Sequence, residues 1–259
     1  MAIRLKTADE IEKMRRAGRV VRSVLDRIGE MAVPGAATRD FEAEARRMTQ
    51  AAGAEPLFLN VPSRSGAGPY PAYLCVSVNE ELVHGIPGDR VIRNGDIVSV
   101  DFGVRLDGWC ADAAETFLVG QVPPETRRLV EVTRNVLAKA IGMCRPGQKW
   151  SRVARQMQAY VEGAGFSVVR KFVGHGIGQT MWEPPQVPNF VSPELEHRDI
   201  LLRDGLVLAV EPMVNMGAAD VEQGPDGWTV LTRDRLPAAH FEHTLAIRAG
   251  SCEVLTDGR

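Results

Sequence analysis

The feature that most constrains the fold is that the 259-residue chain repeats part of itself. The segments VLDRIGEMAVPG (24–35) and VLAKAIGMCRPG (136–147) share Val, Leu, Met, Pro and Gly at the same five places. Further on, RNGDIVSVD (93–101) matches RDGLVLAVE (203–211) at nearly the same offset. Two matches in the same order predict a duplicated unit of two helices and strands, packed on itself with pseudo-twofold symmetry. We expect one domain over 1–259, with halves at about 1–120 and 121–259.

Local signals place the helices of the first half. Thr7-Ala-Asp-Glu10 is a capping box, and apolar residues follow it at helical spacing until Pro34-Gly35. A second helix is predicted from about Thr38 to Ala52, ending at Gly53. Residues 61–73 are rich in Pro, Gly and Ser and indicate a loop.

Two acids are brought together by a predicted hairpin. Residues 97–106 read as a buried strand, and Asp107-Gly108 is a strong two-residue hairpin turn. This turn places Asp101 and Asp112 on one face as diagonal neighbours, roughly 7–8 Å apart at the backbone. Two buried acids aimed at one another are costly unless a cation lies between them. The alternative is a surface hairpin with solvated acids.

Composition excludes several classes of protein. The chain is 44% hydrophobic and 25% charged, which suits a globular fold with an ample core. The net charge of −2 gives no reason to expect nucleic acid as a partner. No apolar run approaches the roughly 20 residues that span a membrane, and the early charge at Arg4 argues against a secretory signal. Four scattered cysteines favour a reduced, cytoplasmic protein: Cys75, Cys110, Cys144 and Cys252.

Further residues with ligand chemistry lie in short motifs of the second half. His175 lies in GHGIG, Glu211 ends an apolar strand in AVEPM, and Glu242 lies within HFEHTLAI. A carboxylate in an apolar strand is rarely buried without a partner. A single histidine is more often structural, so His175 gains weight only from the acids. His240 lies two residues before Glu242, on the same face of that strand.

These residues make up a set of four carboxylates and one imidazole: Asp101, Asp112, His175, Glu211 and Glu242. Four acids clustered without a cation would repel one another strongly in a low-dielectric pocket. Oxygen-rich ligands with a single nitrogen suit two divalent ions such as Mn, Fe, Co or Zn rather than a thiolate-bound structural zinc. Paired ions about 3.5–4 Å apart can acidify a bridging water. The sequence therefore predicts a dinuclear metal site.

Six motifs extend this interpretation along the chain: VNEELVHGIP (78–87), NGDIVSVDFGVRLDGWCAD (94–112), GHGIG (174–178), EPMVNMG (211–217), WTVLTRDR (228–235) and FEHT (241–244). By these motifs the chain resembles the type I methionine aminopeptidases, short members of the pita-bread metallopeptidases. The resemblance implies the α/β (α+β) pita-bread fold, with a central antiparallel sheet covered by helices. It implies a cytoplasmic hydrolase that removes the initiator methionine from nascent proteins and peptides.

The resemblance also implies roles for the metal-ligating residues. Asp112 and Glu242 would bridge the two ions, Asp101 would chelate one, and His175 with Glu211 would bind the other. Glu211 would in addition act as the general acid and base.

Substrate contacts follow from the same resemblance. His84, in HGIP, would contact the substrate near the scissile bond as a catalytic residue. The pocket for the first side chain would be formed by Tyr70, Cys75, Met181 and Trp228. Nearly all of these positions are apolar, as a thioether requires, and the alternative for them is ordinary core packing.

Two departures from the family pattern bear on specificity. The family places a second histidine seven residues after the metal-binding one, where this chain has Trp182 in QTMWEPPQ (179–186). We count Trp182 among the substrate-binding residues, because an indole N–H can donate to a substrate carbonyl, although it cannot act as a base or carry charge. The family's pocket-loop Cys and Tyr are replaced by Arg64 and Ala67.

Two alternatives remain open. One is an aminopeptidase of the same fold with altered first-residue specificity, through Arg64 and Ala67. The other is a non-catalytic binding protein, motivated by Trp182. The complete ligand set argues against the second, since unneeded buried acids destabilise a fold. We expect a monomer that binds a peptide or nascent polypeptide, with the ribosomal exit region as a further candidate partner. We expect no targeting domain before the first helix, so such binding would fall to the catalytic domain.

Overall fold

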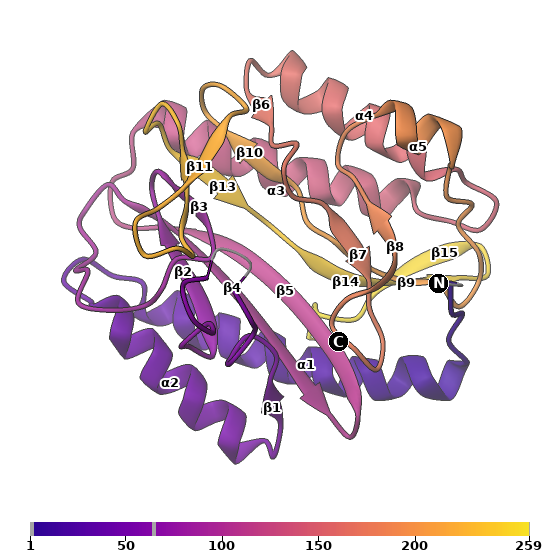
Figure 1. Ribbon diagram of the computed structural model, residues 1–259, viewed down its shortest axis with the longest axis horizontal. Helices are drawn as coiled ribbons and strands as arrows, with labels where there is room; N and C mark the ends of the chain where they lie inside the picture. Colours follow the sequence, from indigo (N-terminus) through magenta and orange to yellow (C-terminus); the bar gives the residue numbers. More distant parts are fainter. Residues whose placement is uncertain (1–2, 64–65, 259) are drawn as a thin grey trace.

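A computed structural model describes residues 3–63 and 66–258 (Figure 1). The helices within these ranges are α1 (Ala8–Met31), α2 (Thr38–Ala51), α3 (Pro124–Met143), α4 (Trp150–Gly163) and α5 (Pro193–His197). The strands of the first half are β1 (Glu55–Pro56), β2 (Leu74–Val78), β3 (Glu81–Val83), β4 (Ile97–Leu106) and β5 (Trp109–Leu118). Those of the second half are β6 (Ser167–Val168), β7 (Gly174–Gly176), β8 (Glu183–Val187), β9 (Val207–Val210), β10 (Met213–Asn215), β11 (Val221–Gln223), β12 (Val230–Thr232), β13 (Ala238–His240), β14 (His243–Arg248) and β15 (Ser251–Val254).

The first helix begins where its capping box predicts. The Glu10 N–H donates to Thr7 Oγ1 at 3.3 Å, and the Thr7 N–H donates to Glu10 Oε2 at 2.9 Å. The predicted apolar positions all face the interior: Ile11, Met14, Val21, Leu25 and Ile28. The helix ends at Met31, shortly before Pro34.

The strands form antiparallel pairs throughout the described residues, divided among four sheets. The sheet of the first half contains β1, β4 and β2 in that order, with β5 paired to β4. The five-stranded sheet of the second half has the order β15-β14-β9-β7-β8. Two three-stranded sheets, β13-β10-β6 and β11-β12-β3, complete the set, and the last of these joins strands from both halves.

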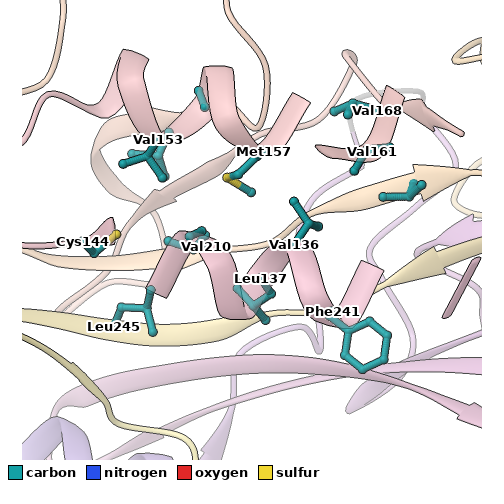
Figure 2. Close-up of a cluster of buried hydrophobic side chains, with 14 of the residues drawn as sticks. Val136, Leu137, Cys144, Val153, Met157, Val161, Val168, Val210, Phe241 and Leu245 are labelled. Atoms are coloured by element: carbon teal, nitrogen blue, oxygen red, sulfur yellow. The ribbon is translucent and has the colours of Figure 1, made fainter. Parts of the chain in front are cut away.

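Two hydrophobic cores hold the helices on the sheets. In Figure 1, α1 and α2 lie along the lower edge of the molecule and α3 and α4 along the upper edge, with the strands between them. One core joins α1 and α2 to β2 and β4, and the other joins α3 and α4 to β9 and β14. Figure 2 shows part of the second core, in which Leu137 of α3 and Met157 of α4 approach Val210 and Leu245 of the strands.

The architecture confirms the expected mixture of helices and antiparallel strands. The central sheet that we expected is divided into the separate sheets described above. The order of two helices followed by strands occurs in each half, as α1, α2 and β4 and as α3, α4 and β9. On this basis we propose that the halves at about 1–120 and 121–259 are duplicated units of one domain. No helix among the described residues is long and apolar enough to cross a membrane.

The packing of α1 against the C-terminal segment leads to a test of stability. Gly18 is buried, and a Cβ added there would lie 1.9 Å from the carbonyl oxygen of Leu255, a backbone atom. We expect Gly18→Ala to lower the free energy of unfolding by about 1–3 kcal/mol, the usual cost of overpacking. For a chain of this size, each kcal/mol lowers Tm by about 2–4 °C, which thermal unfolding followed by circular dichroism measures.

Gly142→Ala in α3 is the matched control, because a Cβ there meets nothing within 4 Å. It should leave stability unchanged or raise it by at most about 1 kcal/mol, as replacement of an exposed helical glycine does. Equal losses in the two variants would contradict the steric explanation.

Candidate metal centre

The hairpin of β4 and β5 has the predicted register. Leu106 pairs with Trp109 and Gly103 with Asp112, while Asp101 pairs with Ala114, so the two acids are diagonal neighbours on one face. The turn is formed by Asp107 and Gly108, with φ of 50° and 79°. Both positive values fit the hairpin turn that an Asp-Gly pair favours. A Cβ at Gly103 would lie 2.9 Å from Asp112 Oδ1, so glycine leaves the carboxylate its room.

A third acid joins this pair where the two larger sheets meet. Ala114 of β5 and Glu242, just before β14, exchange backbone hydrogen bonds of 2.9 and 3.3 Å. The Thr244 hydroxyl donates to the Asp112 carbonyl at 2.8 Å and accepts from the Asp112 N–H at 3.0 Å. These bonds fix the backbones of Asp112 and Glu242 relative to one another.

His175 and Glu211 approach from the neighbouring strands of the second half. His175 of β7 pairs with Ala209 of β9, and Glu211 follows the end of β9. His175 Nε2 lies 3.7 Å from Glu211 Oε1. His175 Nδ1 lies 2.9 Å from the Gly176 carbonyl, which can only accept, so Nδ1 carries the proton and Nε2 keeps a free lone pair. The ring is thus held in the tautomer that a metal ligand needs.

These residues fit a metal site. One ligand atom each of Asp112, His175 and Glu242 lies within 4.8 Å of the others. Among the described residues, three carboxylate atoms are buried with no hydrogen-bond partner: Asp101 Oδ1, Asp112 Oδ1 and Glu242 Oε1. Buried polar atoms are normally paired, so these unpaired acceptors, two of which belong to the close group of Asp112, His175 and Glu242, call for a cation. The oxygen-rich set with one imidazole suits a divalent metal.

Burial raises the pKa values of the clustered carboxyl groups. Burial raises the pKa of Asp112 to about 7. Burial, with the charge of Asp112 adding to it, raises the pKa of Asp101, Glu211 and Glu242 well above the ordinary range. In the absence of a cation the cluster therefore favours bound protons, and a bound divalent ion would favour the ionised forms instead.

The predicted pocket residues come together beside the acids. Tyr70, Cys75 and Met181 belong to one buried apolar cluster, against which Trp228 packs. The rings of Tyr70 and Trp228 meet edge to face with centroids 5.1 Å apart. Cys75 pairs directly with Asp101 across β2 and β4, so the cluster adjoins the carboxylates. Phe58 also belongs to this cluster, and the sequence offered only its place in the apolar run LFL (57–59) as a signal.

Two further histidines lie at the ends of β3 and β13, which pack against each other. His84 follows β3 with a φ of 61°, and its ring meets that of Phe172 edge to face at 5.5 Å. Burial lowers the pKa of His84 to about 4. Burial, and to a smaller extent the nearby His84, lowers the pKa of His240 to about 3. Neither Phe172 nor Asn189, whose side-chain amide donates to the Glu211 carbonyl at 2.9 Å, was singled out from the sequence.

The two departures from the family pattern lie at the surface or outside the described residues. Trp182 is 59% exposed, whereas the preceding Met181 is buried in the apolar cluster. Glu183, which follows, is fixed by the buried Lys6 ammonium at 2.8 Å. Trp182 therefore projects from a segment that is held on both sides. Ala67 is exposed, and Arg64 lies outside the described residues.

The match to a family model agrees with this geometry. The model of metallopeptidase family M24 matches residues 12–249, which is most of the chain. The chain therefore belongs to metallopeptidase family M24.

Within this family, the chain is similar to methionine aminopeptidases. Methionine aminopeptidase 1 of Bacillus subtilis is 42% identical over 251 residues, which cover 97% of this chain and 98% of that protein. A crystal structure of methionine aminopeptidase from Thermotoga maritima superimposes with a TM-score of 0.92 at 42% identity, covering 98% of this chain and 99% of that one. The methionine aminopeptidase structure from Rickettsia prowazekii also gives 0.92, at 34% identity over 98% of this chain and all of that one. These matches confirm the resemblance and the pita-bread fold.

The carboxyl cluster should make the stability of the metal-free protein fall as the pH rises. Because the folded-state pKa values are raised, the contribution of these groups is fully present below their ordinary pKa of about 4. It is lost as the pH rises through the raised values, which for Asp112 is about 7. We expect the Tm of chelator-treated protein to be several degrees lower at about pH 7.5 than at about pH 5, as measured by scanning calorimetry.

Asp101→Asn supplies the comparison, because it removes one of the repelling acids and keeps the shape. Its decline in Tm should be shallower than that of the wild type. A parallel decline in both proteins would assign the pH dependence to groups elsewhere.

Proposed function

We propose that this protein is a methionine aminopeptidase that removes the N-terminal methionine from peptides and nascent proteins. The observation that carries the proposal is the convergence of the acids and His175 beside the apolar cluster of Tyr70, Cys75 and Met181. The full-length similarity to methionine aminopeptidases supports the same activity.

The proposed centre holds two divalent ions, of Co, Mn, Fe or Zn. Asp101, Asp112, His175, Glu211 and Glu242 would hold them. Bound there, the ions would supply Lewis acidity and a water that is acidic enough to react at neutral pH. The buried, unpaired oxygens of Asp101, Asp112 and Glu242 support this assignment.

We assign proton transfer to Glu211. Asn189 holds the main chain of Glu211, whose carboxylate faces His175. Among the described residues, no Lys or Arg forms a salt bridge with this carboxylate. As a general base it would take a proton from the attacking water and return it to the leaving amine. His84 would contact the peptide near the scissile bond. The cluster with Trp228 would hold the first side chain and exclude water from it.

Finer properties belong to the same proposal. The free cysteines support a reduced, cytoplasmic location: Cys75, Cys110, Cys144 and Cys252. We propose a monomer that acts on peptides and nascent chains, with the ribosomal exit region as the place where it would meet the latter. Two outcomes would replace the proposed methionine aminopeptidase activity. One is altered first-residue specificity through Ala67 and Arg64, and the other is a non-catalytic binding role.

The activity test compares peptides and metal content in one protein. With Mn or Co added, Met-Ala-Ser should be cleaved faster than peptides headed by Leu, Pro or Arg, since a charged head group would be buried unpaired. Asp112→Asn should reduce kcat/KM by more than about 100-fold and lower the bound metal measured by elemental analysis.

Asp107→Asn is the matched control, because this acid lies in the exposed turn of the same hairpin and an asparagine tolerates its positive φ. It should keep both activity and metal. Preference for another first residue would support altered specificity, and two bound ions without cleavage of any peptide would support the binding role.

Trp182 permits a second test of the same site. A donor aimed at a developing oxyanion is worth about 10²–10³ in rate, and an imidazole can both donate and carry charge. Because Trp182 is 59% exposed, we expect it to contribute little of this, so Trp182→His should raise kcat for Met-Ala-Ser severalfold with unchanged metal content. Steady-state kinetics with elemental analysis measures both.

Trp182→Phe keeps the bulk and removes the indole N–H, so it should match the wild type. If Trp182→Phe is much slower and Trp182→His brings no gain, the indole is itself the donor.

A further inference from the structure

His240 carries a buried polar atom that the metal centre does not explain. Its side chain is 2% exposed, and among the described residues its Nε2 has no hydrogen-bond partner. A buried donor or acceptor without a partner normally costs about 1–3 kcal/mol, which an apolar side chain of similar size would avoid. Unpaired buried polar groups in a folded protein therefore call for a functional explanation.

The backbone places this ring on the same side of its segment as Glu242. Phe241 packs into the core around α3 and α4, so His240 and Glu242, on either side of it, face the opposite way. The His240 backbone is fixed by Thr116, whose hydroxyl donates to the His240 carbonyl at 2.8 Å and accepts from its N–H at 3.0 Å. The ring is thus held on the same face as a proposed metal ligand.

The strand that ends at His240, β13, packs beside the strand that leads into His84, β3. The Ala238 N–H of β13 donates to the Asn79 carbonyl at 2.9 Å. His84 is near enough to influence His240 electrostatically. Its own backbone is held at a positive φ, since the following Gly85 bonds to Val76 and Ser77. The main chain of His84 is therefore fixed, and its ring packs edge to face against the ring of Phe172.

We propose that His240 is a positioning residue for His84. Its Nε2 forms a hydrogen bond with the His84 ring, directly or through one water, when a peptide occupies the cleft. A neutral imidazole has one donor and one acceptor, so this bond leaves His84 a single tautomer to present to the peptide. A catalytic hydrogen bond can be long in the free protein and shorten in the complex, which fits an unpaired Nε2 in the free chain. The proposal rests on the proposed peptidase function through the role of His84.

The experiment replaces His240 by three side chains that differ in whether and where they carry a nitrogen. A glutamine amide can place its nitrogen near the position of Nε2, an asparagine amide places it near Nδ1, and leucine has neither. His240→Gln, His240→Asn and His240→Leu are each compared for kcat and KM with Met-Ala-Ser, for bound metal and for Tm. His197→Gln, an exposed histidine on α5, is the control that should change none of these.

A second readout does not depend on turnover. Two-bond ¹H–¹⁵N correlation spectra of the zinc-loaded protein report the tautomer of each of its five histidines, and His84 is assigned from a His84→Gln sample. We expect His240→Leu and His240→Asn to change the His84 pattern in the presence of the product methionine. The same two variants should lower kcat about 10- to 100-fold at unchanged KM and metal content. His240→Gln should retain most of the wild-type kcat and most of the wild-type His84 pattern.

The outcomes separate this inference from the proposed function. An unchanged His84 pattern in His240→Leu overturns the inference, as does a loss of activity that follows Tm or metal content in all three variants. If the wild type cleaves no peptide, the proposed function fails, and the spectra still decide whether His240 sets the state of His84.

Discussion

The two backbone hydrogen bonds between Ala114 and Glu242, at 2.9 and 3.3 Å, are the interaction on which the centre depends. They join β5 of the first half to the segment before β14 of the second half, and Thr244 reinforces them through the backbone of Asp112. Side chains alternate between the faces of a strand, so a shift of one residue at this junction would turn Glu242 away from Asp112. The junction thus decides whether the proposed ligands of the two halves meet.

The same junction concentrates negative charge that the folded chain must tolerate. Burial raises the pKa of each of the four carboxyl groups, and their mutual repulsion adds to the cost. Two large apolar cores, one on each pair of helices, flank the centre and offset this cost. Such a distribution, in which stable packing surrounds a destabilised site, is expected where function requires groups that do not favour folding. It also ties the stability of the fold to occupation of the centre, because a ligand that binds only the folded state stabilises it.

Local signals explain which parts of this arrangement could be predicted. The Asp107-Gly108 turn fixes the register of the hairpin, and with it the diagonal of Asp101 and Asp112, from a handful of adjacent residues. The capping box at Thr7 likewise fixes the start of α1. The acids and the histidine in short apolar or glycine-rich motifs indicated Glu211, Glu242 and His175, and the family resemblance then supplied the pocket residues. By contrast, Thr244, Asn189 and Phe172 act through partners far away in the sequence, and no local pattern announces such contacts. The division of the strands into four sheets depends on the same long-range pairing.

Within the described residues, the departures from the family pattern are the exposed Trp182 and Ala67, and neither belongs to the proposed ligand set. A metal ligand is constrained by charge, distance and burial at once, so few side chains can replace it. A residue that orients a neighbour or borders the peptide is constrained by one hydrogen bond or one contact. Trp182, more than half exposed, and His240, buried with an unpaired nitrogen, both belong to this second kind. Substitutions at these two positions should therefore change turnover more than metal content, whereas substitutions among the proposed ligands should change both.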